Sequence, residues 1–248
     1  MRVLRVRYKN TSFYAMLTGD SVQCLNPALG FADPIPLADI LVLPVAAPSK
    51  VVCVGLNYRE HAAELNMPVP DAPSFFLKPP SAIIGTGQAI SLPAVSQRVD
   101  YEAELAIVMG KTAHCLRPED VAEHIFGFTC ANDVTARDLQ TQGVMFGYCK
   151  GFDTFLPLGP WIETDVPNPD ALALRLIQNG EVRQEANTAD MIFSPYELVE
   201  RISHVMTLLP GDVILTGTPP GVGPMAAGDD IRVEVENVAL LINSVVGP

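Results

Sequence analysis

The chain has 248 residues, 48% hydrophobic and 18% charged, a composition typical of a globular protein with one large core or a core plus a small appendage. Its 28 acidic and 16 basic side chains give a formal net charge of −12. Such a surface repels nucleic acid and anionic membranes, so we expect neither as a partner.

Three features of the sequence favour a cytoplasmic protein. No apolar run approaches the roughly 18–20 residues needed to span a bilayer. The N-terminal stretch 1–7 lacks the long apolar segment of a signal peptide. The five cysteines are odd in number and widely spaced, without a Cys-x-x-Cys pair, which is typical of reduced thiols rather than of a disulfide framework or a zinc site.

The first 45 residues predict a small antiparallel β subdomain. Short apolar or alternating stretches are separated there by turn-forming pairs. These stretches cover residues 3–8, 13–17 and 22–25. The proline-bounded segment 44–48 is typical of a short semi-rigid connector. We therefore predict an N-terminal subdomain over residues 1–45 and a main domain over residues 46–248.

After the connector, three short helices are predicted among many short strands. Asn57 is a candidate cap for a helix over 58–65, and a second helix opens at 117–120 with Pro in its first turn. The third begins at Ser194-Pro195. Its apolar positions at helical spacing are Leu198, Ile202, Val205 and Leu209.

Strands dominate the rest of the chain. Residues 51–55 predict a buried strand, and residues 231–246 predict two strands around a turn at Glu236-Asn237. The 22 prolines mark frequent turns, and the regular βαβ alternation of a doubly wound sheet is missing from the sequence pattern. We therefore predict an α+β fold dominated by mixed sheet.

Two glutamates interrupt the otherwise apolar run 101–109, and they suggest a metal site. Side chains alternate along a strand, so Glu102 and Glu104 point the same way, and two like charges beside a core are costly unless a cation neutralises them. Asp133 can add a third carboxylate, as in open catalytic sites for Mg²⁺ or Mn²⁺. The spacing leaves a second interpretation open, in which Asp133 caps the polar stretch 134–140 and the glutamates lie on a solvated sheet edge.

His61 and Glu64 are candidates for general base chemistry. They stand three residues apart in a predicted helix and therefore share a face. A carboxylate beside an imidazole fixes its tautomer and raises its basicity. A surface pairing, or a place on a mobile lid, explains the same spacing.

Several other polar residues are candidates for substrate contacts. Lys78 and Lys150 each stand at the edge of an apolar stretch, where a lysine either contacts an anion or extends to solvent. Arg137 and Gln140 share a side with Asp133 if that segment is helical, and an exposed polar face is the alternative.

The glycine-rich stretch 216–223 does not predict a nucleotide site. It lacks the Gly-Lys-Ser/Thr of a P-loop and the spacing of a dinucleotide fingerprint. A turn that presents backbone N–H groups and the Thr218 hydroxyl to a carboxylate is the interpretation we keep.

In their order along the chain, these motifs resemble the fumarylacetoacetate hydrolase superfamily. The resemblance covers nearly all of the chain after the connector. The matching blocks are Gly55–Tyr58, His61–Glu64, Phe76–Pro79, Asp100–Ala106, Asn132–Asp138, Lys150–Thr154, Asn187–Met191 and Thr216–Pro219.

The resemblance implies a β-rich fold with mixed sheets rolled into a barrel-like core, and a homodimer. It also implies Mg²⁺ or Mn²⁺ held by Glu102, Glu104 and Asp133. One departure is the stretch 142–148, because many relatives place a tryptophan just before the block that begins at Lys150. We expect this segment to shape the substrate pocket.

Catalytic roles follow from the same resemblance. It implies that His61 and Glu64 lie on a loop that orders over bound ligand, with Lys150 close to the metal. The remaining positions, which look like substrate contacts, are Arg137, Gln140 and Thr218, to which we add Lys78 as an anion contact.

We therefore expect metal-dependent cleavage of a carbon–carbon bond at C3 of a small anionic 2-oxo acid, through a metal-stabilised enolate. Hydrolysis of an acylpyruvate is the leading expectation, because the small single-copy form with a His–Glu pair most resembles that subgroup. Decarboxylation of oxaloacetate and isomerisation of a 2-hydroxyhepta-2,4-diene-1,7-dioate use the same enolate. A non-catalytic binding protein is a further alternative, although such a protein has no need of His61, Glu64 and Lys150.

Overall fold

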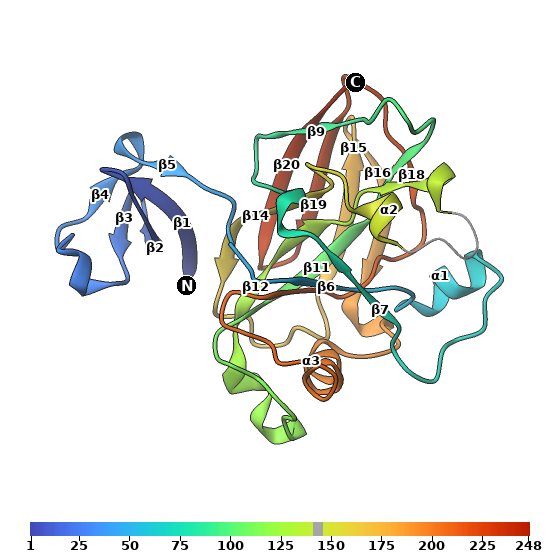
Figure 1. The fold of residues 1–248 in the computed structure, drawn as a ribbon, viewed down its shortest axis with the longest axis horizontal. Helices are drawn as coiled ribbons and strands as arrows, with labels where there is room; N and C mark the ends of the chain where they lie inside the picture. Colours follow the sequence, from blue (N-terminus) through green and yellow to red (C-terminus); the bar gives the residue numbers. More distant parts are fainter. Residues whose placement is uncertain (141–145) are drawn as a thin grey trace.

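Strands and a few short helices make up the computed structural model, which describes residues 1–140 and 146–248 (Figure 1). This β-rich arrangement confirms the predicted class. The α-helices are α1 (Arg59–Glu64), α2 (Gly147–Lys150) and α3 (Pro195–Ser203). No helix in the described residues is long and apolar enough to cross a membrane.

The N-terminal strands form the predicted antiparallel meander. Its strands are β1 (Arg2–Tyr8), β2 (Thr11–Thr18), β3 (Ser21–Cys24), β4 (Ile35–Pro36) and β5 (Leu41–Val42). They enclose a small core of their own, which includes Val6, Phe13 and Val22. In Figure 1 these blue strands stand to one side of the main body. The subdomain boundary at residue 45 stays a prediction, because β1 also pairs with a strand of that body.

The meander continues into one large mixed sheet. The further strands of this sheet are β6 (Val51–Val54), β7 (Phe75–Lys78), β8 (Ile83–Ile84), β11 (Ala103–Met109), β12 (Ile125–Asn132), β14 (Leu156–Glu163) and β17 (Val213–Leu215). The strand order is β4-β3-β2-β1-β14-β12-β11-β17-β6-β7, with β5 on β1 and β8 on β14. The β6–β17 and β8–β14 pairs are parallel and the others are antiparallel.

Two smaller sheets complete the body. A three-stranded sheet has the order β13-β10-β18, and a five-stranded sheet has the order β16-β15-β19-β20-β9. Their strands are β9 (Ala89–Ser91), β10 (Val99–Tyr101), β13 (Thr135–Ala136), β15 (Ala173–Gln178), β16 (Glu181–Asn187), β18 (Gly223–Pro224), β19 (Asp230–Val235) and β20 (Ala239–Val246).

The main core lies between the five-stranded sheet and the middle of the large one. Leu105 and Phe128 from the large sheet are buried in one cluster with Leu174 and Val233 from the smaller sheet. Among the described residues each sheet is an open path of strands. The barrel-like closure implied by the family resemblance is therefore not confirmed and stays a prediction.

Two predicted helix starts are wrong. Asn57 caps nothing: α1 begins after Tyr58 without a side-chain cap, and the fully buried Asn57 amide bonds to distant backbone groups instead. The segment opening at Arg117 forms two 3₁₀ turns, Pro118–Asp120 and Ala122–His124, rather than an α-helix. The chain enters β12 directly after the second turn, and a helix this short has little stability of its own.

The helix predicted from Ser194 is confirmed, but it is shorter than its apolar pattern. The Ser194 hydroxyl accepts a hydrogen bond from the backbone N–H of Glu197 at 3.2 Å, and Pro195 opens the helix. The helix ends at Ser203, so Val205 and Leu209 lie beyond it and are exposed.

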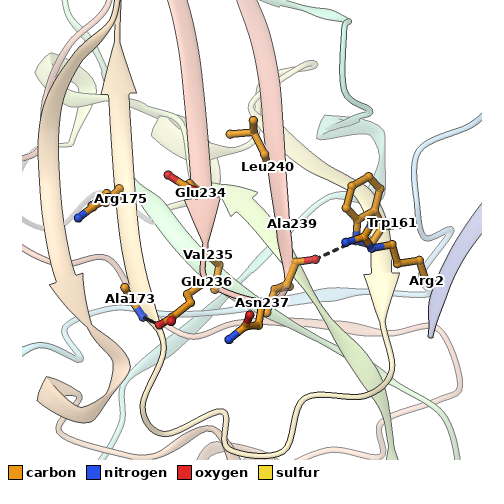
Figure 2. Close-up of a pocket in the computed structure, with 11 residues that line it drawn as sticks. Arg2, Trp161, Ala173, Arg175, Glu234, Val235, Glu236, Asn237, Ala239 and Leu240 are labelled. Carbon is orange, nitrogen blue, oxygen red and sulfur yellow. Dashed lines mark hydrogen bonds between the residues drawn. The ribbon is translucent and has the colours of Figure 1, made fainter.

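A pocket of about 520 Å³ lies where β1 meets the main body (Figure 2). The Arg2 guanidinium stacks 4.6 Å from the centroid of the Trp161 ring, and the Trp161 indole N–H donates to the Val238 carbonyl at 2.8 Å. None of the predicted site residues lines this pocket. It marks the seam between the N-terminal strands and the body, and the candidate site lies elsewhere.

Candidate metal centre

The predicted site residues gather at one end of the large sheet. Glu102 directly precedes β11 and Glu104 lies near its start, while Asp133 directly follows β12, the antiparallel neighbour of β11. Gly217 follows β17, which is antiparallel to β11, and Asn57 follows β6, which is parallel to β17. Because of these strand directions, all five residues lie at the same end of the neighbouring strands.

Three buried carboxylates form the centre of this site. One oxygen each from Glu102, Glu104 and Asp133 lies within 4.8 Å of the other two, and all three residues are buried. Buried like charges at this spacing are costly, and hard divalent cations take carboxylate oxygens as ligands. The donor set therefore fits Mg²⁺ or Mn²⁺ better than a softer metal that prefers thiolate or imidazole.

The predicted strand that carries the two glutamates is interrupted at Glu102. The predicted run divides at Glu102 into β10 and β11, which belong to different sheets. Asn132 covers the break, because its side-chain oxygen accepts from the Glu102 backbone N–H at 2.8 Å. Both glutamates still reach the same site, so the prediction from strand alternation holds despite the break.

The carboxylates differ in their proton affinity. Burial, together with Asp133 and Glu102, raises the pKa of Glu104 well above the ordinary carboxyl range. Burial also raises the pKa of Asp133, but Lys150 and Lys78 outweigh burial and the net shift is downward. Asp133 therefore favours the ionised form more than an ordinary carboxyl does, whereas Glu104 favours the protonated form more.

Two buried lysines neutralise Asp133 from both sides. The Lys150 ammonium donates to Glu102 Oε2 and to Asp133 Oδ2, both at 2.7 Å. The Lys78 ammonium donates to the other oxygen of Asp133 and to the Val134 carbonyl at 2.9 Å. Burial alone would lower the pKa of Lys150, but Asp133 and Glu102 raise it, so the ammonium stays charged. The predicted anion contact of Lys78 is made with a protein carboxylate here.

Arg137 and Gln140 do come together beside Glu102. Arg137 opens a 3₁₀ turn, and its guanidinium donates to the Gln140 side-chain oxygen at 2.6 Å and to Glu102. Its Nε also donates to Asp100 Oδ2 at 2.9 Å. The segment is a short turn rather than the helix considered from spacing, and Arg137 contacts Glu102 while Gln140 contacts Arg137.

His61 and Glu64 form the predicted pair on α1. His61 Nδ1 lies 2.8 Å from Glu64 Oε2, and the His61 residue is 7% exposed, which argues against a simple surface pairing. The other Glu64 oxygen accepts from the Gly221 backbone N–H at 3.2 Å. Gly217, in the same loop, donates its backbone N–H to Glu104. The loop therefore links α1 to the carboxylate cluster.

Thr218 holds that loop against β11. Its hydroxyl donates to the Ala103 carbonyl and accepts from the Gln184 side-chain amide, both at 2.9 Å. Gln184 also accepts from the Ala103 backbone N–H at 2.9 Å. The predicted contact of Thr218 with substrate stays a prediction, because these contacts already engage its hydroxyl in the fold.

Sequence reasoning missed three residues that build the site. Asp100 had a usable signal, because it precedes Glu102 by two residues and so points to the same side of the strand. Asn57 was predicted to cap a helix, but its side chain bonds to a distant backbone carbonyl. No sequence pattern marks Gln184, because its partner Ala103 is 81 residues away.

Part of the stretch 142–148 lies outside the described residues. Of the residues that the structure describes there, Phe146 packs on Phe76, with ring centroids 4.7 Å apart. The Lys150 ammonium lies 5.3 Å from the Phe76 ring centroid. An aromatic pair, one ring from β7 and one from this stretch, therefore stands beside Lys150.

Comparisons with known proteins identify related sequences and structures. The family model described as fumarylacetoacetate (FAA) hydrolase C-terminal matches residues 50–246. Oxaloacetate tautomerase FAHD2A, mitochondrial, from Bos taurus is 45% identical over 224 residues, which cover 86% of this chain and 71% of that protein.

Two solved structures show the same fold over the whole chain. A 5-carboxymethyl-2-hydroxymuconate delta-isomerase from Mycobacterium smegmatis has a TM-score of 0.89 and 42% identity, and the match covers 100% of this chain and 99% of that one. A maleylpyruvate hydrolase from Sphingobium sp. SYK-6, in complex with manganese(II) ion and pyruvate, has a TM-score of 0.82 and 33% identity, with 100% and 99% covered.

Proposed function

Because this chain belongs to the fumarylacetoacetate hydrolase family, we propose that it is a divalent-cation-dependent enzyme that transfers a proton at C3 of a small anionic 2-oxo acid. The observation that carries the proposal is the link between the His61–Glu64 pair and the buried carboxylates through the loop from Gly217 to Gly221. This link joins a cation site to a candidate base.

Glu102, Glu104 and Asp133 would hold the cation. Bound there, Mg²⁺ or Mn²⁺ supplies Lewis-acid stabilisation of the negative charge that develops on the 2-oxo oxygen. The maleylpyruvate hydrolase complex with manganese(II) and pyruvate supports this choice of metal and of ligand class. The choice between magnesium and manganese is left to experiment.

Lys150 and Arg137 supply fixed positive charge beside the reacting end of the substrate. Lys150 is buried and held by Glu102 and Asp133, so its ammonium is pre-oriented and needs no reorganisation as charge develops. Three of the five guanidinium N–H groups of Arg137 bond to protein acceptors, which leaves two for a substrate carboxylate.

His61 is the group that exchanges the proton at C3. Glu64 accepts a hydrogen bond from His61 Nδ1–H when the imidazole is in the tautomer whose free Nε2 acts as base. In the keto direction, neutral His61 takes the proton of the enolic oxygen at Nε2, the electron pair of that O–H bond forms the C2 carbonyl, and the former C2–C3 π pair takes the proton from the imidazolium at C3. The reverse direction breaks the C3–H bond and returns that proton to His61.

Keto–enol or double-bond isomerisation is the leading outcome of this chemistry. The two relatives named as a tautomerase and an isomerase are 45% and 42% identical to this chain, whereas the hydrolase is 33% identical. This order replaces the sequence-based preference for hydrolysis. Isomerisation also needs nothing beyond a base, a cation site and a pre-oriented ammonium.

Hydrolysis of an acylpyruvate-type carbon–carbon bond is the second candidate. The His61–Glu64 pair favours it, because a general base can activate the attacking water. The enolate of pyruvate then leaves and takes a proton at C3, so both candidates share the last step.

Parallel assays with Mn²⁺ decide between the two. The purified protein is given enol-oxaloacetate, acetylpyruvate and a 2-hydroxymuconate-type dienedioate, and enol loss, diketo-acid loss, isomerisation and CO₂ release are followed. We expect enol or double-bond isomerisation to be the fastest reaction. Glu104→Gln is the control for catalysis by free Mn²⁺. Loss of acetylpyruvate without any isomerisation would move hydrolysis into first place, and no acceleration of any reaction would refute the proposal.

A further inference from the structure

The buried carboxylate of Asp100, which takes no part in the proposed reaction, accepts a hydrogen bond from the Nε group of Arg137. Asp100, on β10, is fully buried and accepts from Arg137 Nε at 2.9 Å. It also accepts a two-point contact from Arg98, with Nε at 2.9 Å and Nη2 at 3.1 Å. Asp100 is therefore shared between one arginine of the site and one at the surface.

The backbone fixes the same three residues relative to one another. Asp100 is paired with Thr135 in the ladder between β10 and β13, one strand position from the Val99–Ala136 pair. Arg137 follows directly, and its backbone N–H donates to the Arg98 carbonyl at 2.8 Å. Both the main chain and the side chain of Arg137 are thus anchored on the strand that carries Asp100.

The contacts of Asp100 account for its burial. An ionised carboxylate without solvent is stable only with charged or hydrogen-bonding partners, and two guanidinium groups supply them. Arg98 is the exposed member, with 51% of its side chain accessible, while 26% of the Arg137 side chain is accessible. Removing Arg98 leaves Asp100 with Arg137 alone, so the geometry of Arg137 depends on both groups.

We propose that Asp100, clamped by Arg98, is a positioning residue that aims the free N–H groups of Arg137 at the substrate carboxylate. The inference rests on the proposed function for the substrate class. It assigns Asp100 no contact with substrate or cation. A planar guanidinium fixed at Nε by Asp100, at one terminal nitrogen by Gln140 and at the other by Glu102 has a single orientation, which two-point recognition of a carboxylate requires.

Oxalate binding at saturating Mn²⁺ tests this role without turnover. Oxalate is a planar dianion that mimics an enolpyruvate, and saturation with Mn²⁺ removes any change in metal affinity from the result. The variants are Asp100→Asn, Arg98→Ala and Arg98→Lys, each made in the wild-type and the Arg137→Met background. The matched control is Asp120→Asn, which removes a carboxylate with a similar two-point arginine contact, from Arg117, on an exposed 3₁₀ turn.

If Asp100 acts through Arg137, Asp100→Asn weakens oxalate binding by about 10- to 100-fold in the wild-type background. Arg98→Ala weakens it less, and Arg98→Lys recovers part of that loss. In the Arg137→Met background the Asp100→Asn change costs less than about twofold, because coupled residues are not additive. Asp120→Asn has no effect in either background.

Equal losses from Asp100→Asn in both backgrounds would overturn the inference, because they would indicate a general field or folding effect. No loss in the wild-type background, or no oxalate binding by the wild type, overturns it as well. If Asp100→Asn does not fold, Arg98→Ala in the two backgrounds makes the same comparison with a half-exposed residue. A wild type that binds oxalate but converts no 2-oxo acid refutes the proposed function and leaves this inference standing.

Discussion

Removing Lys150 should make the stability of the protein depend on a divalent cation far more than it does in the wild type. The Lys150 ammonium bridges Glu102 and Asp133 at 2.7 Å, and its side chain is 5% exposed. Removal of one partner from a buried ion pair costs about 3–5 kcal/mol, since the remaining charges lose their compensation. For a chain of this length, about 2–4 °C of melting temperature corresponds to each kcal/mol. Lys150→Met should therefore melt roughly 6–20 °C below the wild type without a divalent cation.

Mg²⁺ should reverse most of that loss. A cation among Glu102, Glu104 and Asp133 replaces the missing positive charge, and in the variant it no longer lies beside an ammonium. The stabilisation by saturating Mg²⁺ should therefore be larger in Lys150→Met than in the wild type. Thermal unfolding of both proteins with and without saturating Mg²⁺, at one fixed pH, measures this difference.

Lys50→Met is the matched control for this experiment. The Lys50 ammonium pairs with Asp212, another buried carboxylate, which also accepts from the Leu209 backbone N–H at 2.8 Å. Asp212 does not belong to the carboxylate cluster. The control should lose stability, and its gain from Mg²⁺ should equal that of the wild type. Equal Mg²⁺ gains in all three proteins would refute the placement of the cation between Glu102 and Asp133.

Three further predictions concern the same site. Glu104→Gln should weaken Mn²⁺ binding by at least about 100-fold, because even the loss of a group that only orients a metal ligand typically costs about 10- to 100-fold; calorimetry measures it, and near-wild-type affinity would exclude Glu104 as a ligand. Because the pKa of Glu104 is raised by burial and by Asp133 and Glu102, the folded protein holds a proton there that the unfolded chain releases. Without divalent cation the contribution of Glu104 to stability should therefore decrease as the pH rises from the ordinary carboxyl range toward the raised pKa, and Mn²⁺ binding should release a proton, seen as a buffer-dependent binding enthalpy that Glu104→Gln lacks. His61→Ala should lower turnover by about 10²- to 10⁴-fold and leave Mn²⁺ affinity unchanged; undiminished turnover would remove His61 from the mechanism.

Local pattern predicted the acidic centre of the site because its geometry is local. Strand alternation placed Glu102 and Glu104 on one side, and the break in the strand at Glu102 did not change that. The i,i+3 spacing likewise brought His61 to Glu64. Asp133 required an assumption about strand order, which the pairing of β11 with β12 supplies.

Long-range partners explain what the sequence could not predict. Asn57 is a residue type that often caps helices, but its side-chain amide donates to the carbonyls of Phe193 and Thr216, which are 136 and 159 residues away. Lys78 was expected to contact an anion, and its ammonium contacts Asp133, 55 residues away. Its contact with a substrate stays a prediction, and the contact with Asp133 depends on a tertiary pairing that the neighbouring residues do not encode.

The β-rich fold class could be predicted from the sequence pattern, whereas closure of the sheets into a barrel could not. Frequent prolines and short apolar runs indicated a β-rich chain, and the strands over 231–246 lie where the turn at Glu236-Asn237 placed them. The barrel-like closure came only from the resemblance, because sheet closure depends on which edges meet, and no local pattern encodes that. The homodimer also stays a prediction.

The proposal that this protein transfers a proton at C3 with a divalent cation is tested most directly by asking whether hydrogen is delivered to one face of C3. Enol-oxaloacetate is converted in D₂O by the protein with Mn²⁺, the keto product is trapped at once by a stereospecific reduction, and deuterium at C3 is located by NMR. From the proposed mechanism we expect Mn²⁺-dependent acceleration with deuterium on one face of C3 for the wild type, and neither for Glu104→Gln. Deuterium distributed equally over both faces at the rate of Mn²⁺ in buffer, by a protein that binds Mn²⁺, would contradict it.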